Sequence, residues 1–201
     1  MSAAPIYGLV LAGGRSTRMQ RDKAVLPYGG VPQLNRAFGL VAGHSERSYV
    51  SVRAGQALEP ARAAKPLIID SVQGEGPLTG IRSAMAAHPE AAWLVVACDL
   101  PFLSHATLAH LVAERDPTGL ATAYRSSHDG LPEPLCAIWE PSAAQALAAH
   151  RLAGGNCPRK FLIRHTARLL EAVEPGALDN INTPDEYSEA QAALSEDGAC
   201  S

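Results

Sequence analysis

Short apolar runs alternate with helical segments along almost the whole chain, and this alternation constrains the fold more than any other feature. The clearest run, residues 93–98, is continuous and apolar, as expected of a strand that is buried on both faces of a sheet. Strands separated by helices are typical of an α/β fold with a mainly parallel sheet. The predicted strands are residues 6–10, 49–52, 66–69, 93–98, 119–124, 135–139 and 167–173.

The predicted helices fill the intervals between these strands, and two of them carry clear start signals. Ser104 is a predicted N-cap, and so is Thr183, which is followed by the acidic Asp185 and Glu186 in the first turn. We expect one domain over residues 1–194 and a flexible tail over residues 195–201. The predicted helices are residues 33–44, 57–64, 78–88, 104–114, 142–150, 158–165 and 184–194.

Composition limits the classes of function. The chain has 201 residues, of which 47% are hydrophobic, and its net charge of -3 gives no reason to expect nucleic-acid binding. The four cysteines are scattered without a C-x-x-C pair, which argues against a zinc site, and Cys98 and Cys136 are predicted core residues. No apolar run approaches membrane-spanning length and no signal peptide is recognisable, so we expect no membrane contact and a cytoplasmic location.

The first predicted strand runs into a segment that suits a polyphosphate. Gly13 and Gly14 allow a sharp turn that leaves backbone N–H groups bare, and cations including Arg18 and Lys23 follow. Bare N–H groups and cations at a strand end are typical of phosphate sites. The alternative is an ordinary glycine turn and a solvated basic loop. Neither the Walker spacing nor the G-x-G-x-x-G fingerprint is present, so a nicotinamide enzyme is not expected.

The string LAGGRSTRMQRDK, residues 11–23, resembles the signature loop of the nucleotidyltransferases, L-A-G-G-x-S-x-R-M-G-x-D-K, and most closely that of the molybdenum cofactor guanylyltransferases (MobA). Gln20 departs from the pattern, which has glycine there, and a side chain at this position can change the backbone geometry of the loop. The resemblance implies a three-layer α/β/α Rossmann-like nucleotidyltransferase fold. It also implies nucleotide contacts from Leu11, Ala12, Gly13, Gly14 and Lys23.

Two acidic residues follow other predicted strands, whose carboxyl ends should gather at one edge of the sheet. Asp99 lies in Cys-Asp-Leu-Pro-Phe, which resembles the family's metal-binding C-D-x-P-[FY], and a polyphosphate site needs a hard oxygen ligand for Mg²⁺. A turn or cap role is the alternative. Asp70 with Gly76, Pro77 and Leu78 resembles the family's D…G-P-L-x-G-[IM] segment, which implies nucleotide contact. Capping by Asp70 and helix initiation at Pro77 would also explain these residues.

The C-terminal half offers candidates for the second substrate. Residues 180–186 resemble the family's N-x-N-T-P-[ED] element, in which Asn182 is predicted to reach the metal or a phosphate. Asn156, Arg159 and Lys160 precede an apolar helical stretch and are predicted to bind the acceptor phosphate, with a solvated helix face as the alternative. Arg53 stands where the family tends to have a nucleotide-contacting Asn, so it either contacts the base or faces solvent.

Together these motifs predict a Mg²⁺-dependent enzyme that transfers GMP from GTP to the molybdopterin cofactor and releases pyrophosphate. Arg18, Lys23 and Asp99 are its predicted catalytic residues. The resemblance also allows transient contact with other proteins of cofactor biosynthesis. One alternative is the same transfer with CTP or another nucleotide and a sugar phosphate or phospho-acid as acceptor. The other is a non-catalytic nucleotide-binding protein.

Overall fold

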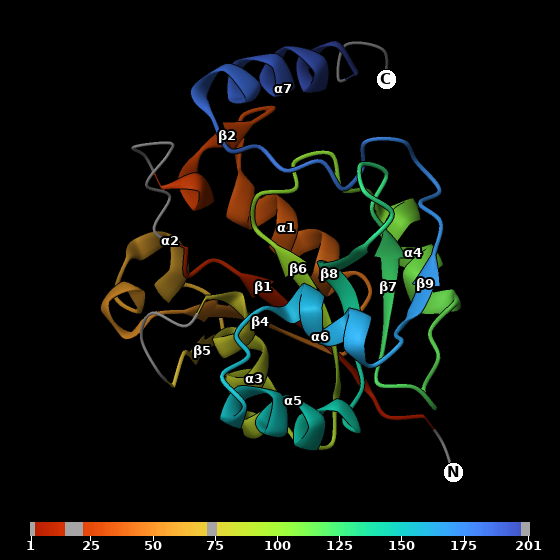
Figure 1. Ribbon diagram of the computed structural model, residues 1–201. Helices are drawn as coiled ribbons and strands as arrows, with labels where there is room; N and C mark the ends of the chain where they lie inside the picture. The colour runs from red at the N-terminus through yellow and green to blue at the C-terminus, as the bar shows by residue number, and fades with distance from the viewer. Residues whose placement is uncertain (1–2, 15–21, 72–75, 198–201) are drawn as a thin grey trace.

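A seven-stranded sheet forms the centre of the computed structural model, which describes residues 3–14, 22–71 and 76–197 (Figure 1). The strand order is β5-β4-β1-β6-β8-β7-β9. Among these strands β8 runs antiparallel to both neighbours and the other pairs are parallel, which confirms the predicted α/β class. The strands are β1 (Ile6–Leu11), β4 (Arg47–Val52), β5 (Leu67–Ile69), β6 (Ala92–Ala97), β7 (Ala121–Arg125), β8 (Pro132–Trp139) and β9 (Arg168–Leu170).

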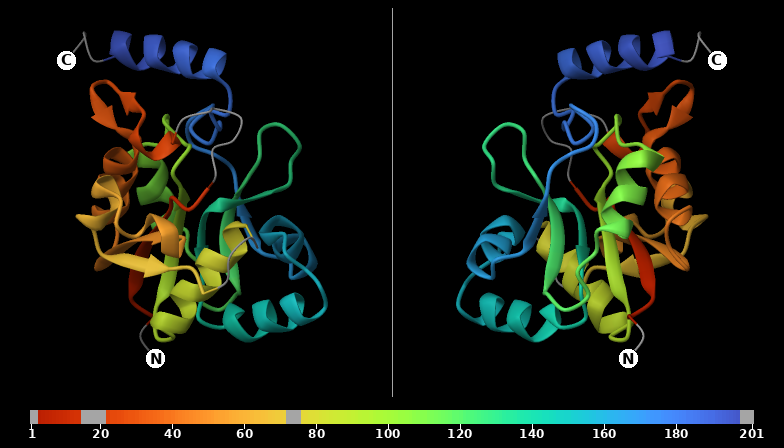
Figure 2. Two further views of the ribbon diagram at one scale, coloured as in Figure 1. Left: turned by 90° about the vertical axis from the view of Figure 1, so that its left-hand side faces the viewer. Right: turned by 90° about the vertical axis from the view of Figure 1, so that its right-hand side faces the viewer.

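Helices cover both faces of the sheet and make three layers (Figure 2). All of β6 is buried, and its side chains alternate between two hydrophobic clusters: Leu94 and Val96 pack with α1 and α4, while Trp93 and Val95 pack with α3, α5 and α6. No described helix is both long and apolar enough to span a bilayer. The helices are η1 (Lys23–Val25), α1 (Gln33–Ala42), η2 (Ala54–Gln56), α2 (Pro60–Ala63), α3 (Pro77–Ala87), α4 (His105–Ala113), α5 (Ala143–Leu152), α6 (Pro158–Arg164) and α7 (Pro184–Asp197).

The connections between strands place a binding edge at the middle of the sheet. From β1 the chain proceeds outward through β4 to β5 and then returns to β6 on the other side of β1. At such a reversal the loops after the two central strands diverge and leave a crevice at their carboxyl ends. The loops that follow β1 and β6 therefore face a common opening.

Both predicted helix caps are confirmed. The Ser104 hydroxyl accepts a hydrogen bond from the Thr107 N–H at 3.1 Å. Thr183 and Glu186 form a capping box, because the Thr183 hydroxyl accepts from the Glu186 N–H and the Glu186 carboxylate accepts from the Thr183 N–H. The helix α7 that follows extends to Asp197, three residues beyond the predicted end at Leu194.

Several predicted boundaries are wrong. The helix predicted over residues 57–64 is the single turn of α2, and β9 ends at Leu170 rather than at residue 173. Strand β8 begins at Pro132, before the predicted residue 135, because a register shift in its pairing with β7 accommodates its two prolines.

The sequence reading also missed a small hairpin of β2 (Pro27–Tyr28) and β3 (Val31–Pro32). Strands of two residues carry no periodicity. Their turn is explained by Gly29 and Gly30, which both have positive φ as a tight hairpin turn requires. The hairpin supports α7, which lies outside the three layers in all three views (Figures 1 and 2).

Candidate active site

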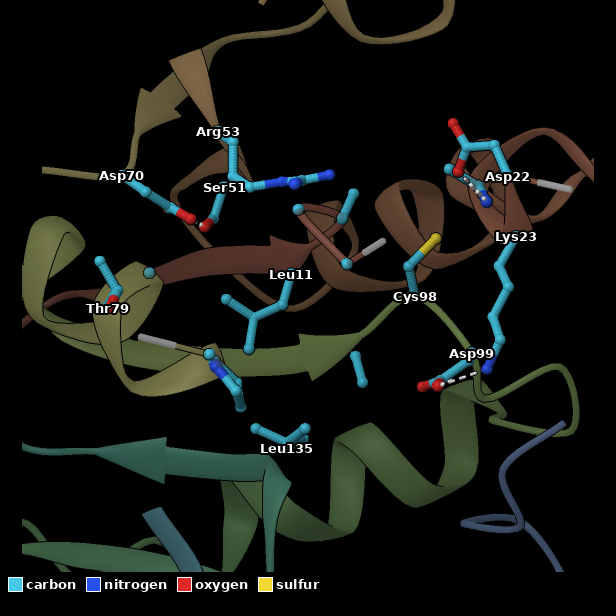
Figure 3. A pocket seen from close by; sticks show the side chains of 18 residues that line it. Leu11, Asp22, Lys23, Ser51, Arg53, Asp70, Thr79, Cys98, Asp99 and Leu135 are labelled. Carbon is cyan, nitrogen blue, oxygen red and sulfur yellow. Dashed lines mark hydrogen bonds and ion pairs between the residues drawn. The ribbon is translucent and has the colours of Figure 1, made fainter. Parts of the chain in front are cut away.

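A cavity of about 390 Å³ opens at the carboxyl ends of β1, β4, β5 and β6 (Figure 3). It brings together the segment after β1, the aspartate after β5 and the aspartate after β6, as the parallel sheet predicts. The residues of the sequence prediction that line it are Leu11, Ala12, Gly13, Gly14, Lys23, Asp70, Gly76, Pro77 and Asp99. Leu78, by contrast, is buried in the core against the sheet.

At one end of the pocket three segments converge on the Lys23 ammonium. Lys23 Nζ lies 3.2 Å from Asp99 Oδ2 and donates to Asn182 Oδ1 at 2.7 Å. The main chain supports this arrangement, because the Ile181 N–H donates to the Asp99 carbonyl at 3.2 Å. The structure therefore places Asn182, a predicted acceptor ligand, beside the predicted catalytic pair.

This end of the pocket has donors of the kind that Mg²⁺ prefers. The Asp99 carboxylate and the Asn182 amide oxygen both point at one cation, the Lys23 ammonium. The described residues contain no cluster of three or more His, Cys, Asp or Glu side chains that could hold a metal alone. Mg²⁺ is commonly held by one or two carboxylates together with substrate phosphates and water, so this donor set fits an ion that arrives with a polyphosphate.

The opposite end of the pocket is built around Asp70 (Figure 3). The Ser51 hydroxyl, on β4, donates to Asp70 Oδ1 at 2.7 Å. Burial raises the pKa of Asp70 above its usual value, and the Ser51 hydrogen bond and the charge of Arg53 oppose that rise without reversing it. Arg53 lines the same end of the pocket, and its contact with a base stays a prediction. This end offers carboxylate acceptors beside guanidinium donors.

Two glycines lie in close packing around this end, and the packing requires glycine at position 80. A Cβ at Gly80 would lie 2.4 Å from the Ser51 hydroxyl and 2.8 Å from a Leu11 methyl group, so α3 could not approach β1 and β4 as it does. A Cβ at Gly13 would lie 3.3 Å from Asp70. Gly13 and Gly14 also line the cavity, so the backbone there faces a ligand without an intervening side chain.

The other predicted residues are not among the described residues that line the pocket. Arg18 and Gln20 are outside the described residues, and the role of Arg18 stays a prediction. Arg159 forms ion pairs with Asp129 and Glu133 at 2.9 and 3.0 Å, while Asn156 and Lys160 are exposed. The structure does not place these three residues of the α6 region in the pocket lining, and their binding of an acceptor stays a prediction.

Sequence reasoning missed three residues that line the pocket, Ser51, Asp22 and Thr79, and one that lies behind it, Arg62. Asp22 and Thr79 stand at positions within the two motifs to which no role was assigned, while Ser51 and Arg62 lie in segments that read as ordinary strand and helix. Arg62 is the clearest case, since it is 1% exposed and pairs with Asp22. Cys98 also lines the pocket, but burial raises the pKa of its thiol to about 12, so it is neutral and behaves as the predicted core residue.

The sequence matches the MobA-like NTP transferase domain over residues 8–170. The chain belongs to this family. It is therefore a nucleotidyltransferase, and its pocket lies where the sequence motifs of the family predicted it.

Named relatives are consistent with this assignment. The chain is 34% identical to the molybdenum cofactor guanylyltransferase of Pseudomonas paraeruginosa, over 90% of this chain and 92% of that protein. It is 33% identical to the molybdenum cofactor biosynthesis bifunctional protein of Synechocystis over 94% of this chain, and it spans only 54% of that longer protein.

A solved structure shows the same fold. Molybdopterin-guanine dinucleotide biosynthesis protein A from Archaeoglobus fulgidus superposes with a TM-score of 0.79 at 24% identity, covering 94% of this chain and 99% of that one. The predicted three-layer nucleotidyltransferase fold is confirmed.

Proposed function

We propose that this MobA-like enzyme transfers GMP from GTP to the molybdopterin cofactor and releases pyrophosphate, with Mg²⁺ as the metal and the cytoplasm as its location. The observation that carries the proposal is the two-ended pocket, which Lys23 and Asp99 line at one end and Asp70 at the other, with Asn182 outside the lining but bonded to Lys23. Relatives that bear the name molybdenum cofactor guanylyltransferase support the choice of substrates.

The reaction needs little covalent help from the protein. An oxygen of the acceptor's terminal phosphate attacks the α-phosphorus of GTP, the bond from that phosphorus to the bridging oxygen breaks, and pyrophosphate leaves with the electron pair. A phosphate monoester is already ionised at neutral pH, because its second pKa is about 6, so no general base is required. The enzyme's task is to align the reactants and offset negative charge.

The residues of the pocket divide this task. The Gly13 and Gly14 backbone accommodates the phosphates, and the Lys23 ammonium offsets charge on the departing pyrophosphate. Asp99, with the Asn182 oxygen beside it, would hold Mg²⁺, which when bound neutralises phosphate charge. At the other end the Asp70 carboxylate accepts hydrogen bonds from the N–H groups of a guanine, while Arg53 donates to its oxygen or ring nitrogen.

Pyrophosphate release tests the proposal. GTP, CTP, ATP and UTP are each supplied with Mg²⁺, with or without molybdenum-loaded molybdopterin. We expect release from GTP only, and only with the cofactor present. Release from CTP, or with a sugar phosphate in place of the cofactor, would instead support the broader alternative. GTP binding without pyrophosphate release for any acceptor would support a non-catalytic nucleotide-binding protein.

Substitution of Asp99 is the first variant to compare. Asp99→Asn should reduce pyrophosphate release by at least about 100-fold, because the site loses its negatively charged Mg²⁺ ligand and residue 99 no longer pairs ionically with Lys23. Asp116→Asn is the matched control, since this exposed carboxylate bonds to Thr118 away from the pocket lining. Equal turnover in the two variants would remove Asp99 from the mechanism.

A further inference from the structure

The buried guanidinium of Arg62 joins the end of β1 to Asp22, which lie on either side of Gly13 and Gly14 in the sequence. From α2, Arg62 Nη1 donates to Asp22 Oδ2 at 2.6 Å and Nη2 donates to Asp22 Oδ1 at 3.0 Å, which is a two-pronged contact. Nη2 also donates to the Ala12 carbonyl at 3.0 Å, at the end of β1. Glu59 supplies a further carboxylate to Nη1. One side chain therefore links the end of β1 to the residue that immediately precedes Lys23.

The Asp22 carboxylate passes this restraint on to Lys23. While it holds Arg62, Asp22 Oδ1 also accepts from the Ala24 N–H at 3.1 Å and caps the short helix η1. Lys23 is the first residue of that helix, and its ammonium reaches Asp99 and Asn182. Asp22 is therefore the single residue between Arg62 and Lys23 in this series of contacts.

The chemistry of this link requires arginine. Only a guanidinium presents parallel donors for a carboxylate and a further donor for a carbonyl in one plane. Burial works to raise the pKa of Asp22, but the hydrogen bonds from Arg62 and from Ala24 outweigh it and hold that pKa below its ordinary value. The ion pair is thus a charged one at neutral pH.

We infer that Arg62 is a positioning residue for nucleotidyl transfer, which fixes Asp22 against the end of β1 so that the Lys23 ammonium is held beside Asp99. Arg62 is 1% exposed, lies outside the pocket lining and need not touch the substrate. The turnover predicted below rests on the proposed function, whereas the predicted effects on backbone protection and nucleotide binding do not.

The chain contains a closely matched control for Arg62. Arg115 also forms a buried two-pronged pair, with Glu140 at 2.7 and 2.8 Å, and also donates to a backbone carbonyl, that of Ala4 at 2.8 Å. Ala4 precedes β1, so this pair lies at the opposite edge of the sheet from the pocket. Arg115→Met and Arg62→Met should both lower stability, but only a positioning role predicts a local effect at the active site for one of them.

The first measurement is amide hydrogen exchange in the region of residues 22–28, under conditions in which each variant is folded. We expect Arg62→Met to raise exchange there by at least about tenfold, because η1 loses the anchored carboxylate that caps it. Arg115→Met should leave this region protected. Arg62→Lys keeps the positive charge but cannot make the two-pronged contact with Asp22, so it should raise exchange by an intermediate amount.

The second measurement is the dissociation constant of whichever of the four nucleoside triphosphates the wild type binds most tightly. Arg62→Met should weaken binding, and combining it with Lys23→Met should weaken binding no further than Lys23→Met alone, because Arg62 acts through Lys23. If the wild type releases pyrophosphate, kcat at saturating nucleotide should also fall about 10- to 100-fold in Arg62→Met and stay within about twofold in Arg115→Met.

These measurements separate the two proposals. A wild type without pyrophosphate release overturns the proposed function, while exchange and nucleotide binding still decide the role of Arg62. Unchanged protection in residues 22–28 overturns the positioning role. Additive effects of Arg62→Met and Lys23→Met, or equal losses of kcat in Arg62→Met and Arg115→Met, overturn it as well.

Discussion

Lys23 is the residue on which the charge arrangement of the pocket depends. Its ammonium meets the Asp99 carboxylate and the Asn182 amide, and its side chain is only 18% exposed. A cation held in a partly desolvated site stabilises transition-state charge more strongly than one in water. We therefore expect Lys23→Ala to lower kcat by about 100- to 1,000-fold. Lys65→Ala, which removes an ammonium stacked on Phe38, should leave kcat unchanged; similar kcat values for the two variants would contradict the assignment.

Ser51 tunes the other end of the pocket through one hydrogen bond. Burial raises the pKa of Asp70, and the Ser51 hydroxyl limits that rise by stabilising the carboxylate. Ser51→Ala should therefore raise this pKa further, so that Asp70 becomes protonated at a higher pH and stops accepting nucleotide hydrogen bonds there. The acid limb of the pH profile of kcat/KM for GTP should move to higher pH. An acid limb that coincides with that of the wild type would argue against nucleotide contact by Asp70.

Helix α7 acts at the scale of the element, because it anchors the segment that carries Asn182. It packs on the hairpin through a cluster that includes Tyr28, Ile181 and Ala190, and the Tyr187 hydroxyl donates to the Pro27 carbonyl at 2.8 Å. A chain that ends at Thr183 should lose stability, at about 1.5–3 kcal/mol for each core side chain exposed. Its kcat should fall about tenfold or more, since Asn182 is no longer held beside Lys23.

The matched control for this truncation is a chain that ends at Asp197, which retains the whole helix. It should melt and turn over like the full-length protein. Thermal unfolding and kcat, the latter measured well below the unfolding transition, report the two effects separately. Full activity in the chain that ends at Thr183 would show that α7 only covers the hairpin.

At the scale of the whole molecule, the Arg115–Glu140 pair joins α4, β8 and the segment before β1 at the edge of the sheet away from the pocket. Both side chains are buried, at 8% and 2% exposed. Glu140→Gln leaves the guanidinium buried without a charged partner and should lower the free energy of unfolding by about 3–5 kcal/mol. Denaturant unfolding measures this loss. Arg168→Gln, in an exposed pair with Glu114, should cost less than about 1 kcal/mol.

The same distinction between local and distant contacts explains which parts of the fold and site were predictable. Trp93 to Cys98 read as a buried strand because every side chain in that run is apolar, and Gly13, Lys23 and Asp99 could be singled out because they lie in short strings at strand ends. The hairpin of β2 and β3 was missed because strands of two residues have no periodicity. The cations of α6 looked free in the sequence, yet Arg159 pairs with two carboxylates, Asp129 in the loop between β7 and β8 and Glu133 on β8.

By itself the sequence determined the α/β class, the place of Gly13, Gly14 and the two aspartates at strand ends, and both helix caps. These features depend on periodicity, on short local motifs and on hydrogen bonds between residues that are neighbours in the chain. Only the tertiary structure decided that Asn182 contacts Lys23 and that Arg62 joins Asp22 to the end of β1. Such pairs are separated by many residues, and their geometry arises when the strands order themselves in the sheet, which no local pattern specifies.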